Sequence, residues 1–242
     1  IVQASGFTLY DMNKLPELGG GKSPNVVDQA GLEALATAAA AGDGVIRRPS
    51  DNQPVKSVVF VQCAGQRDST GTHLSYCSGF CCNASIKQAM YFKDANPSID
   101  TTIIFSDLRT PGNGEDFYRS AQEKGVIFTK GKVAQVVPNG NTSTVKFHDL
   151  ILDDQDAAMA DVDLVVLATG QVANSGVDIF AAPKTAEEEA AVEVKPISIL
   201  NLTYRQGSDV PQLKQGFTDS HFICFPYETR RTGIYTAGPV RR

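Results

Sequence analysis

Residues 59–92 have the sequence VFVQCAGQRDSTGTHLSYCSGFCCNASIKQAMYF and contain four of the five cysteines of the chain. The apolar run Val58–Val61 at the start is typical of a strand buried on both faces. Apolar residues at helical spacing, including Ile86 and Ala89, predict a helix after the last cysteine. We expect either Ser78 or Asn83 to cap that helix. The cysteines follow one another in the pattern C-x13-C-x3-C-C at Cys63, Cys77, Cys81 and Cys82.

Four thiolates are the ligand set of a [4Fe-4S] cluster, and soft sulfur ligands select iron-sulfur clusters or zinc over hard cations. The pattern favours the cluster, because structural zinc usually binds two CxxC-like pairs. Adjacent Cys81 and Cys82 would form a disulfide only through a small strained ring. Three alternatives stay open: structural zinc, a thiol redox pair, and cysteines that are simply buried without a ligand.

The sequence on both sides of the cysteines predicts an α/β fold. A second apolar run at Thr101–Phe105, a helix over Glu115–Lys124 and a third strand at Val126–Thr129 alternate as in a three-layer, Rossmann-like nucleotide domain. A helix over Pro24–Gly42 precedes this region. The polar segment Arg47–Pro54 is a predicted crossing between substructures.

Further along the chain, Asn139-Gly140 lies between two β-like segments, which predicts a hairpin. The acidic run Asp153–Asp163 is predicted to be a solvated edge. Asp161–Gly170 is a predicted buried strand that ends in Ala168-Thr169-Gly170. A glycine there permits the backbone to approach a ligand closely.

Composition excludes several functional classes. The chain has 242 residues, 42% hydrophobic and 20% charged, as expected of a globular protein. Its net charge of −5 leaves no basic field to attract nucleic acid. We find neither an apolar run of about 20 residues that would span a bilayer nor a signal peptide, which predicts a soluble protein of the reducing cytoplasm. Because both ends fall inside strand-like patterns, we expect a piece of a longer polypeptide.

The chain lacks an intact dinucleotide loop after its first nucleotide-type strand. Such a loop has the pattern GxGxxG, whereas Gln62–Gln66 contains only Gly65. The nucleotide site is therefore predicted to be disabled or repurposed. Asp107 stands where a Rossmann fold keeps its ribose-binding acid, and a surface ion pair is the alternative. A cofactor groove could instead be lined by Thr169-Gly170, the segment Gly233–Gly238 and the turn at Gly6.

Three segments resemble the A subunit of heterodisulfide reductase and its relatives: Gln62–Asp68, Tyr76–Cys82 and Ile86–Ala89. The ending Phe222–Tyr235 is most similar to the B subunit of the quinone-interacting membrane-bound oxidoreductase of sulfate reducers. The resemblance covers nearly the whole chain.

The resemblance implies a thioredoxin-reductase-like flavoprotein in which a nucleotide-type domain is inserted into an FAD domain. Residues 1–54 and 131–242 would then be parts of the FAD domain, and residues 55–130 the inserted domain with the cysteines. Gly170 and Gly238 match the family's FAD-side glycine turns. Two departures are clear: the family's N-terminal FAD loop has no counterpart, and Pro239 stands where related reductases have an aspartate. The four cysteines Cys63, Cys77, Cys81 and Cys82 match those that bind the family's cluster.

The predicted function is electron transfer between FAD and a [4Fe-4S] cluster in a redox complex of sulfur metabolism. Its partners would be other subunits, including a membrane-bound quinone-reactive one, with no nucleic acid and no membrane span in this chain. No catalytic residue is assigned. Two alternatives are a pyridine-nucleotide-dependent thiol oxidoreductase and an interaction module stapled by zinc.

Overall fold

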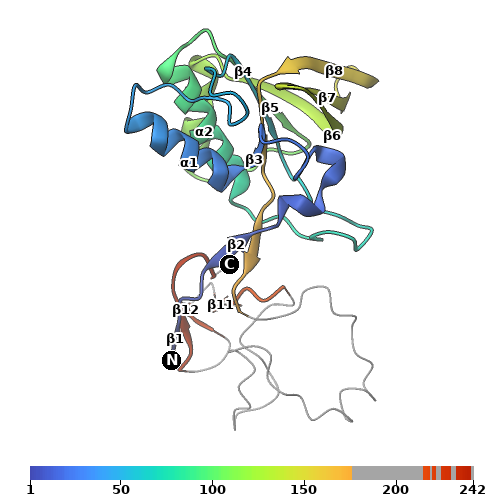
Figure 1. Ribbon diagram of the computed structural model, residues 1–242. Helices are drawn as coiled ribbons and strands as arrows, with labels where there is room; N and C mark the ends of the chain where they lie inside the picture. The colour runs from blue at the N-terminus through green and yellow to red at the C-terminus, as the bar shows by residue number, and fades with distance from the viewer. Residues whose placement is uncertain (176–214, 219, 222–224, 230–232, 241–242) are drawn as a thin grey trace. The chain divides into compact units, whose positions relative to one another are not determined.

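A computed structural model describes residues 1–175, 215–218, 220–221, 225–229 and 233–240, and it forms two compact units. One unit combines Ile1–Leu9 with Gln171–Arg242, and the other is Tyr10–Gly170 (Figure 1). The boundaries predicted from the sequence, after residues 54 and 130, both fall inside the Tyr10–Gly170 unit. Within the described residues no helix has the length and apolar character needed to cross a membrane.

The Tyr10–Gly170 unit is built on one seven-stranded sheet, which confirms the predicted α/β class. Its first five strands are parallel and the last two are antiparallel. The order across the sheet is β3 (Val26–Asp28), β9 (Leu164–Leu167), β4 (Ser57–Val61), β5 (Asp100–Phe105), β6 (Ile127–Asn139), β7 (Thr142–Asp149) and β8 (Asp154–Val162).

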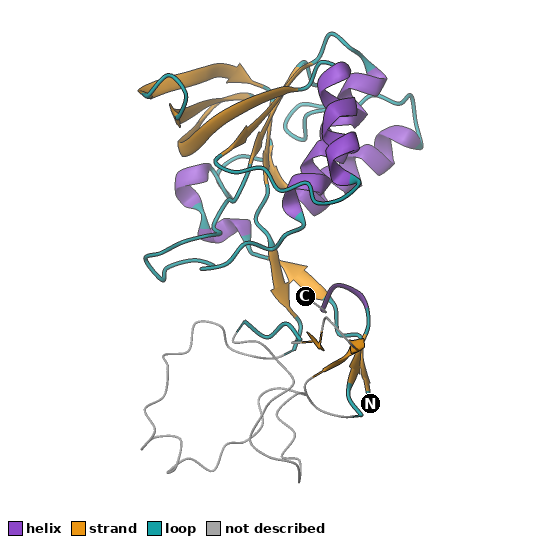
Figure 2. Ribbon diagram, turned by 180° about the vertical axis from the view of Figure 1, so that it is seen from behind, coloured by secondary structure: helices purple, strands orange, loops and turns teal. Residues whose placement is uncertain are grey.

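Helices α1 (Gln29–Ala40), α2 (Cys81–Ala95) and α3 (Gly114–Glu123) lie together beside the sheet (Figure 2). Their apolar side chains form one core with alternate residues of the central strands, such as Leu32 with Phe60 and Phe92. The neighbouring residues along β4, Val59 and Val61, are equally buried although they point to the opposite face. At the far edge the sheet curls, so that β7 contacts β9 and β8 contacts β4. The unit therefore has three layers: the helices, the parallel strands and the curled antiparallel strands.

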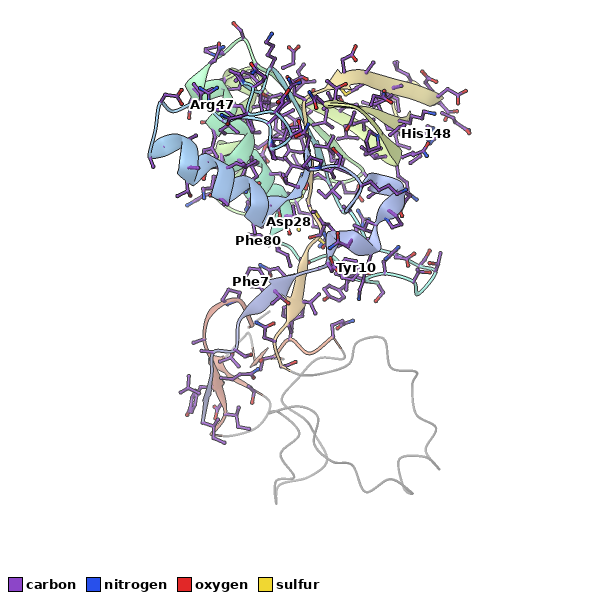
Figure 3. All side chains as sticks on the ribbon, in the orientation of Figure 1. Phe7, Tyr10, Asp28, Arg47, Phe80 and His148 are labelled. Atoms are coloured by element: carbon purple, nitrogen blue, oxygen red, sulfur yellow. The ribbon has the colours of Figure 1, made fainter. Side chains whose placement is uncertain are left out.

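Two predictions about helix ends are wrong. Helix α1 begins at Gln29 and not at Pro24, because Val26–Asp28 pairs with β9 as an edge strand. Asp28 then caps α1 by accepting a hydrogen bond from the Gly31 N–H at 2.7 Å (Figure 3). Helix α2 is capped by neither Ser78 nor Asn83. Its N-cap is Phe80, which makes no side-chain capping bond.

The predicted hairpin is confirmed. Asn139 pairs with Thr142 across the turn, and Gly140 has a positive φ of 64° that favours glycine. The acidic strand β8 is mostly exposed at the edge of the sheet, as predicted. Between Leu9 and Pro24 the chain includes two short 3-10 helices, η1 (Met12–Lys14) and η2 (Pro16–Leu18).

The other unit contains small sheets. Strand β1 (Val2–Gln3) is parallel to β13 (Tyr235–Thr236), and β2 (Phe7–Leu9) is antiparallel to β10 (Gln171–Ala173). The first of these sheets also includes β12 (Phe225–Thr229) and β11 (Ser220–His221), and a short 3-10 helix, η3 (Gly238–Val240), follows β13.

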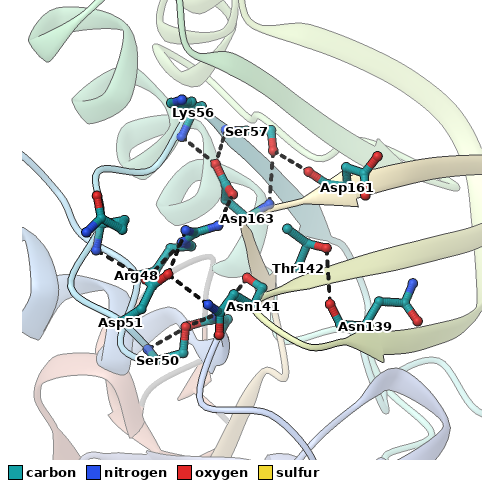
Figure 4. A network of polar contacts seen from close by, with 12 residues as sticks. Arg48, Ser50, Asp51, Lys56, Ser57, Asn139, Asn141, Thr142, Asp161 and Asp163 are labelled. Carbon is teal, nitrogen blue, oxygen red and sulfur yellow. Dashed lines mark hydrogen bonds and ion pairs between the residues drawn. The ribbon is translucent and has the colours of Figure 1, made fainter.

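A buried ion-pair network ties the segment Arg47–Pro54 to the start of β9 (Figure 4). Asp163, which is 7% exposed, accepts from Arg48 Nη1 at 2.6 Å and from the Lys56 N–H at 2.7 Å. Arg48 also pairs with Asp51 at 2.7 Å. The segment predicted to cross between substructures is therefore fixed against the sheet.

Replacing Asp163 with asparagine is expected to destabilise the chain by about 2 kcal/mol, because hydrogen bonds to a buried charge are lost and Arg48 keeps a single partner. Urea unfolding of the variant and the parent protein measures this difference. Asp43→Asn is the control, since its ion pair with Arg47 is exposed and should matter little. Equal midpoints for Asp163→Asn and the parent would contradict the prediction.

Candidate functional site

The fold brings the four predicted cysteines to one end of the central parallel strands. Cys63 follows β4, Cys81 and Cys82 are the first residues of α2, and Cys77 lies in the loop between them. Cys63, Cys77 and Cys82 are close enough for the charges of the last two to act on the first. The carboxyl end of parallel strands is where α/β folds bind ligands, and a helix N-terminus favours negative charge.

The buried cysteines are poor nucleophiles in the absence of a metal. Burial raises the pKa of Cys81 to about 12, and the neighbouring thiols act in the same direction. Burial also raises the pKa of Cys63 and Cys82. Reactive cysteines instead have a lowered pKa. A bound cation would lower the pKa of these thiols, because coordination deprotonates a thiol.

Two of the four sulfurs have a hydrogen-bond donor from the protein, and such bonds stabilise a thiolate. The Gly79 N–H lies 3.4 Å from Cys77 Sγ, and Gln66 Nε2 lies 3.3 Å from Cys81 Sγ. Burial raises the pKa of Cys63 and Cys82, and against it Arg67 lowers the pKa of Cys63 and the Arg109 backbone lowers that of Cys82.

The loop after β4 has an unusual backbone conformation. Cys63 and Arg67 both have a φ of 56°, a region that costs a residue with a side chain about 1 to 3 kcal/mol. The Gln66 N–H closes this turn on the Cys63 carbonyl at 3.0 Å. At Gly65 a Cβ atom would lie 3.0 Å from Leu15, so this glycine serves close packing against protein. Strain at Cys63 is consistent with a functional position.

Gln66 connects the cysteine site to the end of β9, and sequence reasoning did not identify it. Its Nε2 donates to Cys81 Sγ and, at 2.9 Å, to the Ala168 carbonyl. Its Oε1 accepts from the Ser78 N–H at 3.0 Å and from Ser78 Oγ at 2.7 Å. Nothing in the sequence distinguishes it from Gln62, whose buried amide has no partner among the described residues.

Thr169 and Gly170, predicted to face a cofactor, lie against the cysteine site. At Gly170, where φ is 88°, a Cβ would lie 2.3 Å from Gln66 Cδ and 2.6 Å from Ser78 Oγ. Thr169 is fully buried, and within the described residues its hydroxyl has no hydrogen-bond partner. The close neighbour that requires glycine at position 170 is therefore a protein side chain. A role of these two residues toward a flavin stays a prediction.

Gly6 and Gly238, the other two predicted cofactor residues, belong to the unit formed by the two ends of the chain. Both have a positive φ, 68° and 74°, and a Cβ at either position would meet no atom within 4 Å. Both are thus turn glycines with open space beside them. A cofactor groove shared with Thr169 and Gly170 stays a prediction.

Asp107 was predicted to be either a ribose-binding acid or part of a surface ion pair, and it forms an exposed ion pair. Arg67 Nη1 lies 2.7 Å from Asp107 Oδ2, and this carboxylate is 58% exposed. The hydrogen bond and the charge of Arg67 lower the pKa of Asp107. Arg67 thus connects this carboxylate with Cys63, and sequence reasoning did not identify it either.

The donor chemistry of the site fits an iron-sulfur cluster. A single zinc ion needs its sulfurs about 2.3 Å from one point. In the part of the chain that the structure describes, no three or more His, Cys, Asp or Glu side chains are arranged to hold one metal ion. A cube of four irons binds one thiolate at each of its four corners, which spreads the sulfurs farther apart. Four cysteines gathered at the end of β4 and the start of α2 provide the sulfur ligands of that set.

Two solved structures are similar in chain trace. The HOCl-induced flavoprotein disulfide reductase RclA of Escherichia coli aligns with 100% of this chain and 38% of its own, at a TM-score of 0.47 and 15% identity. Thioredoxin reductase of T. acidophilum aligns with 100% of this chain and 57% of its own, at a TM-score of 0.45 and 15% identity. The chain matches no family model.

Curated relatives are more similar in sequence. The A subunits of H(2):CoB-CoM heterodisulfide,ferredoxin reductase from Methanothermobacter marburgensis and Methanothermobacter thermautotrophicus are 32% and 36% identical, each over 98% of this chain and 33% of the relative. The second iron-sulfur A subunit of CoB--CoM heterodisulfide reductase from Methanopyrus kandleri is 33% identical with the same coverage. These names do not support the closer likeness to the quinone-interacting B subunit that the sequence suggested. The chain is similar in sequence to these heterodisulfide reductase A subunits along nearly all of its length, and it spans about a third of the length of these relatives.

Proposed function

We propose that this chain is a segment of an electron-transferring oxidoreductase of the heterodisulfide reductase A-subunit type, with a [4Fe-4S] cluster on its cysteines. The observation that carries the proposal is the gathering of four cysteines at the end of β4 and the start of α2, two of them with a hydrogen-bond donor at the sulfur. The name of the Methanopyrus kandleri relative, which describes it as an iron-sulfur protein, supports it. The proposed ligands are Cys63, Cys77, Cys81 and Cys82.

When bound, the cluster supplies one-electron transfer. The residues of this chain exclude water and control charge around it. Burial of Cys81 and Cys82 lowers the local dielectric, and the positive N-terminal end of α2 faces the thiolates. Arg67 places a cation at Cys63. The helix end and Arg67 favour the added negative charge of a reduced site, whereas burial opposes it.

The proposal includes FAD in the complete polypeptide, bound by a thioredoxin-reductase-like domain. Ile1–Leu9 and Gln171–Arg242 would contribute parts of that domain, and Tyr10–Gly170, which holds the cysteines, would be the inserted one. The glycine turns at Gly6 and Gly238 leave open space for a ligand. The buried hydroxyl of Thr169, without a partner among the described residues, is a further polar group near Gly170. Pro239 stands where related reductases have an aspartate, and it cannot make the flavin contact of that side chain.

We propose that other subunits of a cytoplasmic redox complex are the partners. The sequence resemblance of Phe222–Tyr235 suggests a finer assignment, a quinone-interacting complex with a membrane component. Residues 222–224 and 230–232 of that motif lie outside the described residues. The relatives support only the coarser assignment, a heterodisulfide reductase-type complex.

The two alternative functions have less support. A thiol oxidoreductase needs a cysteine of lowered pKa, whereas the pKa of Cys63, Cys81 and Cys82 is raised. A zinc module needs sulfurs set around a single point, and within the described residues such an arrangement is not present.

Anaerobic metal analysis of the purified chain tests the proposal. We expect about four irons per chain, matching acid-labile sulfide, and broad visible absorption from sulfur-to-iron charge transfer. Zinc without iron would overturn the proposal in favour of the zinc module. Protein free of metal, with a thiol that reacts rapidly near neutral pH, would overturn it in favour of the thiol oxidoreductase.

A further inference from the structure

The side chain of Gln66 joins three separate segments at the cysteine site. It is 7% exposed, and both ends of its amide are hydrogen-bonded. The bonds connect the loop after β4 with Ser78 in the cysteine loop, with Cys81 at the start of α2, and with Ala168 after β9. One buried amide thus links a proposed ligand sulfur to the end of a neighbouring strand.

The orientation of this amide is fixed by its partners. The Ser78 N–H can only donate, so the Gln66 atom facing it must be the oxygen. The Ala168 carbonyl can only accept, so the atom facing it must be the NH₂ nitrogen. Rotating the amide by 180° would break both bonds. The N–H that points at Cys81 is therefore held in place by bonds that do not involve the sulfur.

Gly170 sets the distance of the amide from the end of β9. Because a Cβ there would lie 2.3 Å from Gln66 Cδ, any larger residue would push the amide away from this position. The site thus uses a glycine of positive φ to admit one buried glutamine. The glutamine is thus held both by hydrogen bonds and by the space that Gly170 leaves for it.

We propose that Gln66 is a positioning residue that raises the redox potential of the cluster by donating a fixed N–H to the sulfur of Cys81. This inference rests on the proposed function, because it requires the cluster. Reduction adds one electron to the cluster and makes its ligand sulfurs more negative. A fixed donor stabilises the more negative form more strongly, so its presence favours reduction. No bond or proton at Gln66 changes in the step.

The test is a potentiometric titration of the anaerobically purified chain, with dithionite as reductant and the cluster's EPR signal as readout. Gln66→Met keeps the side-chain length but removes both N–H donors. We expect it to lower the ratio of reduced to oxidised cluster at the parent midpoint threefold to tenfold, roughly 30 to 60 mV for a one-electron couple. Gln66→Glu, which adds negative charge where the donor was, should lower it at least as far.

Gln88→Met is the matched control. Gln88 is equally buried on α2, but its amide donates to the Gln29 carbonyl at 2.8 Å and to Glu33 at 3.1 Å. Its replacement should therefore reduce stability and leave the midpoint potential unchanged. If Gln88→Met and Gln66→Met shifted the midpoint potential equally, the proposal would be overturned, because a general loss of rigidity around α2 would explain both shifts.

If Gln66→Met fails to bind iron, the milder variant Ser78→Ala still tests the proposal. It removes the 2.7 Å bond that polarises the amide and leaves the amide itself in place. We expect a smaller shift to lower potential. A variant of Gln66 or Ser78 with full iron content and an unchanged or raised potential overturns the inference. Absence of iron from the parent protein instead overturns the proposed function, so the two failures are distinguishable.

Discussion

Replacing Cys81 with serine is expected to remove most of the iron from the protein. Cys81 is 6% exposed and lies at the first turn of α2. A serine oxygen is a hard, weakly acidic ligand that competes poorly for iron against thiolate. We expect iron to fall from about four atoms per chain to fewer than about one, with matching loss of visible absorption.

Cys224→Ser is the control for this experiment. Cys224 is the only cysteine outside the cysteine pattern and lies outside the described residues. Its replacement should leave the iron content unchanged. If Cys81→Ser retained all of its iron, Cys81 would not be a ligand. If Cys224→Ser lost as much iron as Cys81→Ser, the predicted ligand set would be incomplete.

The clustering of the cysteines and the central strands could be predicted from sequence because both are local signals. Val58–Val61 is a continuous apolar run, and the four cysteines all lie within the short segment Cys63–Cys82. The start of α1 could not be predicted in this way. Val26–Asp28 becomes a strand only because it pairs with β9, which lies far later in the chain.

The residues around the sulfurs were hidden for the same reason. Gln66 and Gln62 lie four residues apart in the same segment, and only the folded chain brings Ala168 to one of them. Asp163 was part of a run predicted to be solvated, and its last residue turns out to be buried against Arg48. The acidic composition of Asp153–Asp163 predicts exposure for the run as a whole, but it does not show that Asp163 alone is buried.

The glycine at position 170 was expected to let a ligand approach the backbone, but the groups that approach it are protein side chains. The sequence indicated that something approaches the backbone closely there, and the structure identifies Gln66 and Ser78 as the close neighbours. A glycine after a buried strand was therefore informative about space. It did not specify which group fills that space.

Gly170→Ala is expected to destabilise the metal-free chain by about 3 kcal/mol. Its φ of 88° contributes about 1 kcal/mol of backbone strain, and the overlap with Gln66 and Ser78 adds about 2 kcal/mol. Urea unfolding of the full chain measures the change.

Gly44→Ala isolates the backbone contribution, because its φ is 79° and a Cβ there meets nothing within 4 Å. We expect it to cost about 1 kcal/mol. The difference between the two variants then measures the crowding at the cysteine site alone. Since the displaced amide of Gln66 can no longer hold Cys81 Sγ at 3.3 Å, Gly170→Ala should also retain less iron than Gly44→Ala. Equal losses of stability in the two variants would mean that Gln66 does not lie against residue 170, and the hydrogen-bond network proposed to tune the cluster would lose its support.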